Sequence, residues 1–254
     1  MKAFTNKTIL LVEDDPIIQT IEVSALKNYG YRMIVASTGQ EAINVIEKSR
    51  EIDLILMDID LGSNSLDGTE TAQIILFNHD IPIVFLSSHT EPGIVEKTEK
   101  ITSYGYVVKS SHITVLDASI KMAFKLFEAH QKLLESEEKF KQVYDNTLDN
   151  IFILEITDDR RYKVIGLNPA EEALVSRYGK LLNKYLDESI PDEIYREVKK
   201  NYERCVLERR IISYEESVYG QNFYTQLIPV KNKDGEIYRI IGIARNISDL
   251  NSEN

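Results

Sequence analysis

The sequence predicts two domains of different class. The first half is expected to be an α/β domain with a doubly wound, five-stranded parallel sheet, like that of flavodoxin. A long helix is expected to join it to an α+β domain with a five-stranded antiparallel sheet. Two observations lead to this prediction: short apolar runs alternate with amphipathic stretches up to about residue 110, and β-rich runs follow residue 150. A chain of 254 residues is long enough for both domains.

The apolar runs of the first half are expected to be strands, and the stretches between them helices. The predicted strands are Ile9–Val12, Met33–Ala36, Leu54–Met57, Ile83–Leu86 and Tyr106–Val108, and the predicted helices are Pro16–Lys27, Gln40–Lys48, Thr69–Phe77 and Glu91–Ile101. Asp15 followed by Pro16 is typical of a helix start with Asp15 as the N-cap. Functional groups in such a sheet gather at the carboxyl ends of the strands.

A long, highly charged helix without Gly or Pro is predicted from about His112 to Tyr144. Its apolar residues recur at intervals of three and four, which indicates a helical seam. They are Leu116, Ile120, Ala123, Phe127 and Leu134. Two interpretations remain open: the first part packs on the sheet and the rest is a solvated linker, or the helix forms a parallel dimeric coiled coil. His130 lies on this seam and is interpreted as packed or exposed, without a function.

The second half reads as strands that enclose helices. The predicted strands are Ile151–Ile156, Tyr162–Leu167, Ile211–Val218, Phe223–Val230 and Ile237–Asn246, with a helix at Pro191–Glu208. Asp234 and Gly235 lie between the last two runs and predict a hairpin turn.

Acids and a lysine are predicted to converge at one edge of the first sheet. Glu13 and Asp14 follow the first strand, Asp58 follows the third, and Ser87 and Lys109 follow the fourth and fifth. Neighbouring carboxylates raise one another's pKa unless a cation keeps them ionised, and oxygen ligands beside a phosphate suit Mg²⁺. Asp58 would then be the nucleophile that forms an acyl phosphate, with its charge neutralised by the metal and Lys109.

The motifs LVEDDP, LILMDIDLG, DGTETA, IPIVFLSS and YGYVVKS, in this order, resemble the receiver domain of two-component response regulators over about Lys7 to Phe127. The resemblance implies that Asp58 is the phosphoacceptor, and that Ser87 and Tyr106 form the switch pair beside Lys109. It also implies that Glu13, Asp14, Asp58 and the backbone carbonyl of Asp60 bind Mg²⁺. The phosphoryl donor would be a histidine kinase or a phosphotransfer protein. Ser110 departs from the family pattern, in which a proline usually follows the lysine.

One alternative class fits part of this pattern. Asp58 and Asp60 resemble the nucleophile and acid of the haloacid dehalogenase phosphatases. In that superfamily the further metal-binding acids follow the lysine, whereas Glu13 and Asp14 here precede the nucleophile. A phosphatase assay separates the two interpretations.

The segments SEEKFKQVYDNTLDNIFILEI, GLNPAEEAL and IIGIARNISDL resemble a PAS sensory domain over about Ser136 to Leu250. The domains are therefore expected to be a receiver at 1–128, a helical linker at 129–147 and a PAS domain at 148–254. All four histidines precede the PAS domain, so haem is not expected there. Its ligand stays open, because aromatic residues on strands are usually core. The aromatic residues considered are Phe152, Tyr162, Phe223 and Tyr224.

Composition limits the location and the partners. With 30 basic and 41 acidic residues, the net charge of −11 disfavours nucleic-acid binding. Cys205 is the one cysteine, which excludes an intrachain disulfide and indicates a reducing compartment. We expect a cytoplasmic signalling protein without a membrane span, a homodimer, and no enzyme activity beyond phosphoryl acceptance and autodephosphorylation. It is either an adaptor that acts through dimerisation or a piece of a larger histidine kinase.

Overall fold

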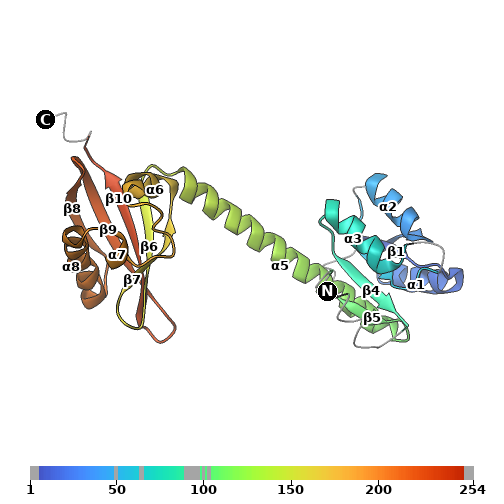
Figure 1. Cartoon of the computed structure of the whole chain (residues 1–254). Coiled ribbons are helices and arrows are strands. Elements are labelled where there is room, and N and C mark those ends of the chain that lie inside the picture. The colour runs from blue at the N-terminus through green and yellow to red at the C-terminus, as the bar shows by residue number, and fades with distance from the viewer. Residues whose placement is uncertain are drawn as a thin grey trace. The chain divides into compact units, whose positions relative to one another are not determined.

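The computed structural model describes residues 6–48, 51–62, 66–88, 98, 101 and 104–248. It divides the chain into two compact units, Met1–Glu135 and Ser136–Asn254 (Figure 1). Among the described residues, no helix is both long and apolar enough to cross a lipid bilayer.

The first unit contains a parallel sheet with the strand order β2-β1-β3-β4-β5. The strands are β1 (Thr8–Val12), β2 (Arg32–Ala36), β3 (Leu54–Asp58), β4 (Ile83–Ser87) and β5 (Tyr106–Val108). The helices are α1 (Pro16–Asn28), α2 (Gly39–Lys48), α3 (Gly68–Asn78) and α5 (Ile113–Asn146). This confirms the doubly wound class and its predicted strands. The predicted helix Glu91–Ile101 falls outside the described residues, except for Thr98 and Ile101.

The sheet is covered on both faces. Side chains alternate along β1, so Leu10 packs with α2 and α3, whereas Ile9 packs with α1 and α5. Each such buried side chain contributes about 1.5–3 kcal/mol to stability. A sheet buried on both faces holds its strand ends at fixed positions, which gives the site at their carboxyl ends a rigid support.

The first turns of α5 pack on the sheet, as one of the two interpretations of the long helix predicted. Leu116, Ile120 and Ala123 are buried in the core. The buried Asp117 carboxylate accepts a hydrogen bond from the Tyr31 hydroxyl at 2.8 Å and one from Lys121 at 2.5 Å. After Phe124 the helix continues to Asn146 with mostly exposed side chains.

The second unit contains an antiparallel sheet with the strand order β7-β6-β10-β9-β8. The strands are β6 (Asn150–Ile156), β7 (Tyr162–Leu167), β8 (Ile212–Val218), β9 (Gln221–Lys231) and β10 (Ile237–Asn246). The helices α6 (Pro169–Val175), α7 (Leu186–Ser189) and α8 (Asp192–Glu208), with the short 3₁₀ helix η1 (Ser176–Tyr178), lie between β7 and β8 in the chain. The predicted hairpin at Gly235 is confirmed, with a φ of 82° that favours glycine.

Asn168 ties the start of the second unit together. Its side chain is fully buried and caps α6 by accepting a hydrogen bond from the Glu171 N–H at 3.0 Å. The same oxygen accepts from the Ile151 N–H at 2.9 Å, while the amide donates to the carbonyls of Tyr144 at 3.2 Å and Asp149 at 2.9 Å. One side chain therefore joins the end of α5, the start of β6 and the start of α6.

Candidate functional site

The register of the parallel sheet brings the predicted site residues to one edge. Val12 pairs with Met57, so the next residues, Glu13 and Asp58, emerge side by side. Ser87 pairs with Val108, and Lys109 follows directly. The prediction that Glu13, Asp58 and Lys109 meet at the carboxyl ends of the strands agrees with this register.

Lys109 bridges two buried carboxylates. Its Nζ lies 2.7 Å from Asp58 Oδ2 and 2.6 Å from Glu13 Oε2. The side chains of Asp58 and Glu13 are 2% and 1% exposed, and that of Lys109 is 12% exposed. One ammonium therefore holds two carboxylates in a largely water-excluded position, where each charge would be costly without the other.

Burial and charge shift the pKa values of this group in opposite directions. Desolvation raises the pKa of Asp58 to about 6, and the negative charge of Glu13 raises it as well, although Lys109 lowers it. Burial alone lowers the pKa of Lys109, but its hydrogen bonds to Asp58 and Glu13 more than offset this, so the pKa is raised. Lys109 is therefore a fixed positive charge beside a carboxylate of raised pKa.

Three carboxylates at this edge could hold a metal ion. The ligand oxygens of Glu13, Asp14 and Asp58 lie within 4.8 Å of one another, and Asp14 is exposed. An all-oxygen set of this kind, open to solvent on one side, fits Mg²⁺, which keeps several waters and shares its remaining positions with phosphate oxygens. The three predicted carboxylate ligands are thus brought together, and Asp60 follows Asp58 two residues later in the chain.

Asp60 and Ser110 lie beside the centre of the site. The Asp60 N–H donates a hydrogen bond to Asp58 Oδ1 at 3.3 Å, and the Asp60 side chain is exposed. All described peptide bonds are trans, including the one between Lys109 and Ser110. The Lys109 N–H donates to the Ser87 carbonyl at 2.8 Å, which secures the start of this loop to the end of β4.

The two predicted switch residues occupy neighbouring strands. Ser87 at the end of β4 is fully buried, and Tyr106 at the start of β5 is half-buried against the core that includes Phe85. Phe85 pairs with Tyr106 in the sheet, which places Ser87 two residues further towards the site edge. Ser87 thus lies on β4, which pairs with the strand that ends at Asp58, and Tyr106 lies on β5, which leads to Lys109.

The loop after Asp58 is held by the start of α3. Asp67 is the N-cap of α3 and forms a reciprocal capping box with Glu70. The Gly68 N–H donates to the Ile59 carbonyl at 2.9 Å. These bonds fix the backbone that follows the candidate nucleophile, so the DGTETA motif has a structural role here.

Glu22 is a site residue that the sequence analysis missed. It lies on α1, and its pKa is raised to about 7 by burial and then by the charge of Glu13. Together with Lys109 it lines a cavity of about 280 Å³ next to the site. The sequence does indicate that Glu22 is buried, because it falls four residues after Ile18 and four before Leu26, on the apolar side of the helix.

The fold and site define a class, namely doubly wound α/β domains with an oxygen-rich, lysine-containing site at the carboxyl ends of the strands. Residues 9–121 match the family model described as the response regulator receiver domain. This part of the chain is therefore a receiver domain. The match covers the expected motifs, and it gives no support to the haloacid dehalogenase alternative.

Curated relatives match about half of the chain. The uncharacterized transcriptional regulatory protein YrkP of Bacillus subtilis is 30% identical over 134 residues, covering 52% of this chain and 55% of the relative. Transcriptional regulatory protein ZraR of Klebsiella oxytoca is 32% identical over 131 residues, covering 50% of this chain and 28% of the relative. The chain thus spans about half of the first relative and less of the second.

A similar solved structure is the N-terminal domain of a response regulator/sensory box/GGDEF three-domain protein from Carboxydothermus hydrogenoformans. It is 43% identical and covers 49% of this chain and 98% of that chain, with a TM-score of 0.46.

Proposed function

We propose that Asp58 accepts a phosphoryl group in a Mg²⁺-dependent reaction and that the protein acts in two-component phosphorelay signalling. The observation that carries this proposal is the ion triad in which Lys109 contacts both Asp58 and Glu13. A carboxylate oxygen of Asp58 attacks phosphorus, the bond from phosphorus to the donor breaks, and an acyl phosphate remains. The donor is a histidine kinase or a phosphotransfer protein.

The residues around Asp58 have separate roles in this proposal. Mg²⁺ held by Glu13, Asp14, Asp58 and the Asp60 carbonyl would neutralise the charge of the phosphoryl oxygens. Lys109 supplies a second, fixed positive charge. The Ser87 hydroxyl donates to a phosphoryl oxygen, and Tyr106 moves with it towards the core, because the modification adds nearly two negative charges at the sheet edge. Hydrolysis of the acyl phosphate resets the domain.

Phosphorylation is tested with acetyl phosphate as the donor and intact mass as the measurement. The wild-type protein should gain one phosphoryl group with Mg²⁺ and none with EDTA, and Asp58→Asn should gain none. Asp60→Asn is the matched control, because its side chain is exposed and only its backbone is assigned a role. A wild-type protein that stays unmodified contradicts the proposal. Repeated hydrolysis of phosphate esters that Asp60→Asn abolishes would instead make the protein a phosphatase.

We further propose that the second unit is a PAS sensory domain, with the receiver at 1–128 and the helical linker at 129–147. Support comes from the strand order β7-β6-β10-β9-β8 of the antiparallel sheet. The helices of the unit all lie between β7 and β8 in the chain. Asn168 connects this unit to the end of α5 through the Tyr144 carbonyl. A shift of α5 would therefore act directly on the start of β6 and α6. A cytoplasmic location and the absence of nucleic-acid binding stay predictions.

Homodimerisation through α5 completes the proposal. The predicted seam is buried on the sheet at Leu116, Ile120 and Ala123, so it cannot pair there with a second copy. A second apolar stripe runs along another face of α5, with intervals of three, four or seven residues. Its large members are Val115, Met122, Leu126, Leu133, Phe140 and Val143, which are 48% to 72% exposed. The spacing of 3.5 residues suits a parallel coiled coil with a second copy of the chain. The charged residues on the other faces of α5 would keep this stripe soluble until it pairs.

The oligomeric state tests the stripe. The double variant Leu126→Lys/Leu133→Lys should be a monomer in sedimentation experiments in which the wild type is a dimer. The reason is that each lysine charge would be buried where the two stripes pair. Leu134→Lys is the control, since Leu134 is 44% exposed but lies outside the stripe. A wild-type monomer, or equal effects of the two changes, contradicts pairing through these residues.

A further inference from the structure

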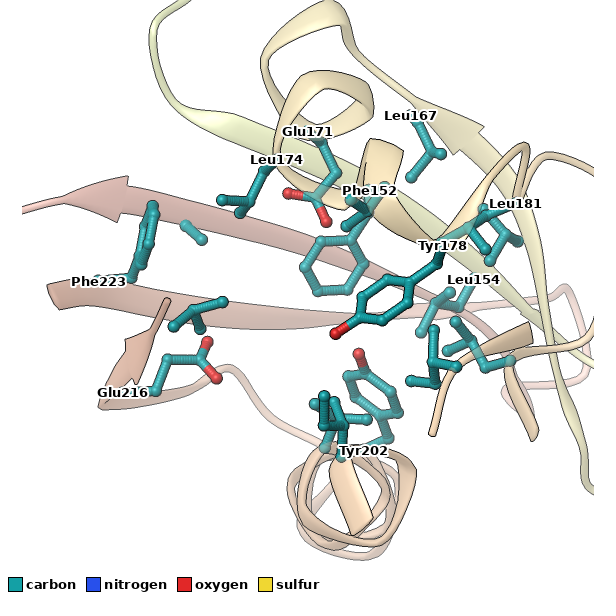
Figure 2. Close-up of a pocket in the computed structure, with 18 of the residues that line it drawn as sticks. Phe152, Leu154, Leu167, Glu171, Leu174, Tyr178, Leu181, Tyr202, Glu216 and Phe223 are labelled. Carbon is teal, nitrogen blue, oxygen red and sulfur yellow. The ribbon is translucent and has the colours of Figure 1, made fainter. Parts of the chain in front are cut away.

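The second unit contains a partly open cavity of about 130 Å³. It lies between the sheet and the helices α6 and α8, and Figure 2 shows its lining residues. Most of them are apolar, and among the described lining residues none is basic. The polar ends that reach this space belong to two glutamates and four tyrosines. They are Glu171, Glu216, Tyr178, Tyr202, Tyr214 and Tyr219.

Glu171 is a buried carboxylate without a partner. The residue is only 9% exposed, and Figure 2 shows its carboxylate directed into the cavity. Its backbone N–H is bonded to Asn168, but in the described part of the chain no hydrogen-bond donor or cation contacts its side-chain oxygens. A carboxylate that is largely removed from water in this way is destabilised if it stays ionised and unpaired.

Glu216 adds a second negative group on the other side of the cavity. It comes from β8, and the Thr225 hydroxyl donates to its Oε1 at 2.5 Å. Burial raises the pKa of both carboxyl groups, and Glu216 also raises the pKa of Glu171, which reaches about 7. Two acids that face a cavity without a basic residue create a negative potential inside it.

Aromatic rings enclose the space next to these acids. Phe152 and Tyr202 pack edge to face with their ring centroids 6.2 Å apart, and the Tyr178 hydroxyl bonds the Tyr219 hydroxyl. The Phe152 ring lies so close to the β10 backbone that a Cβ atom on Gly242 would come within 2.0 Å of it. Ring faces attract cations, and anchored rings do so without loss of side-chain freedom.

We propose that this cavity binds a small organic ammonium ion, whose charged nitrogen pairs with Glu171 and Glu216 while its hydrocarbon part lies among Phe152, Tyr178 and Tyr202. A divalent metal is a poorer fit, because it needs about six oxygen ligands and the lining is mainly apolar. The volume suits a ligand about the size of benzene, since an engineered cavity of about 150 Å³ holds that molecule. Binding would supply the missing partner of Glu171 in the first turn of α6.

Two probes of equal size separate charge from shape. Isothermal titration of the full chain with 3-methylbutylamine and with its neutral isostere 3-methylbutanol, at neutral pH, should show binding of the amine about tenfold tighter than that of the alcohol. Glu171→Gln keeps the shape of the side chain and removes its charge, so it should weaken amine binding by about tenfold and leave alcohol binding unchanged. Glu172→Gln is the matched control, because Glu172 is the exposed neighbour on α6.

Three results would overturn the assignment. The first is equal binding of the amine and the alcohol, which would mean that the cavity selects only by shape. The second is that Glu171→Gln binds the amine as tightly as the wild type does. The third is that neither probe binds, although far-ultraviolet circular dichroism shows that the protein is folded. Titration with the amine in buffers of different ionisation enthalpy measures, independently of affinity, how many protons are released on binding. The wild type should release a proton that Glu171→Gln does not. Glu216, Tyr178, Tyr202, Tyr214 and Tyr219 are the other titratable groups that line the site, and the Arg177 guanidinium lies over the Tyr219 ring.

Discussion

Gly68 lies against the backbone of Asp58 so closely that a Cβ atom on Gly68 would sit 1.8 Å from the Asp58 carbonyl oxygen. The same atom would meet the Asp58 carbonyl carbon at 2.8 Å and the Ile59 Cα at 3.0 Å. These are backbone atoms, which cannot rotate away as the end of a side chain would. The start of α3 therefore approaches the candidate nucleophile only because residue 68 has no side chain.

Gly68→Ala should displace the backbone of Asp58 and reduce phosphorylation by acetyl phosphate. At the first position of a helix this change is otherwise neutral or slightly stabilising, so a loss of about 1–3 kcal/mol in the free energy of unfolding would report the clash. Urea unfolding and intact mass measure the two effects. Gln73→Ala, on the exposed side of the same helix, should alter neither. Unchanged stability in Gly68→Ala would mean that α3 does not approach β3 in this way.

Lys109→Met should destabilise the receiver domain by about 2–3 kcal/mol at pH 8, because Asp58 and Glu13 are left as buried anions without a cation. Added Mg²⁺ should raise the melting temperature of this variant more than that of the wild type, since the metal then supplies the missing charge. Lys7→Met is the control. Its ion pair with Asp53 is 2.8 Å long but the two side chains are 39% and 28% exposed, so its loss should cost about 0–1 kcal/mol. Equal responses to Mg²⁺ would argue against a metal site at these acids.

Asn168→Ala should destabilise the second unit by about 2–4 kcal/mol, because four hydrogen bonds of one buried side chain are lost and a helix loses its N-cap. Hydrogen exchange should accelerate at the amides of Ile151 and Glu171, which Asn168 accepts from. Asn146→Ala provides a comparison, since that exposed side chain makes a single bond to the Gln142 carbonyl at 2.8 Å. If both variants unfold at the same denaturant concentration, Asn168 does not join these elements.

The raised pKa of Glu171 predicts a pH-dependent stability of the second unit. Burial, and then the charge of Glu216, moves this pKa from 4.5 to about 7 in the folded state. Between these two values the folded state holds a proton that the unfolded state has released, so stability falls as the pH rises through this window. Glu171→Gln removes this loss. It should be more stable than the wild type by up to about 3 kcal/mol above pH 7, with little difference near pH 4.

Chemical denaturation at several pH values checks this prediction. Glu172→Gln should follow the wild-type profile, because Glu172 is exposed on the same helix. Parallel profiles for the wild type and Glu171→Gln would show that Glu171 keeps an ordinary pKa when the protein is folded.

The sequence by itself predicted the strands of both sheets and the meeting of Glu13, Asp58 and Lys109 at one sheet edge. Asp15 followed by Pro16 caps a helix because the hydrogen bonds of an N-cap reach only two or three residues, here to the N–H groups of Ile17 and Ile18. The strands could be located from runs of apolar residues. Once a parallel sheet was inferred, the residues after each strand had to meet at one edge, which predicted Asp58 beside Glu13 and Lys109.

Only the tertiary structure decided which groups lose water and which surfaces stay exposed. Ile120 and Leu126 look alike in the sequence, yet the first is buried on the sheet and the second is 48% exposed on α5. Glu171 and Glu172 are neighbours, yet only Glu171 faces a cavity built from strands and helices distant in the chain. Desolvation and packing depend on atoms that the fold brings together from remote segments, so local sequence patterns cannot predict them.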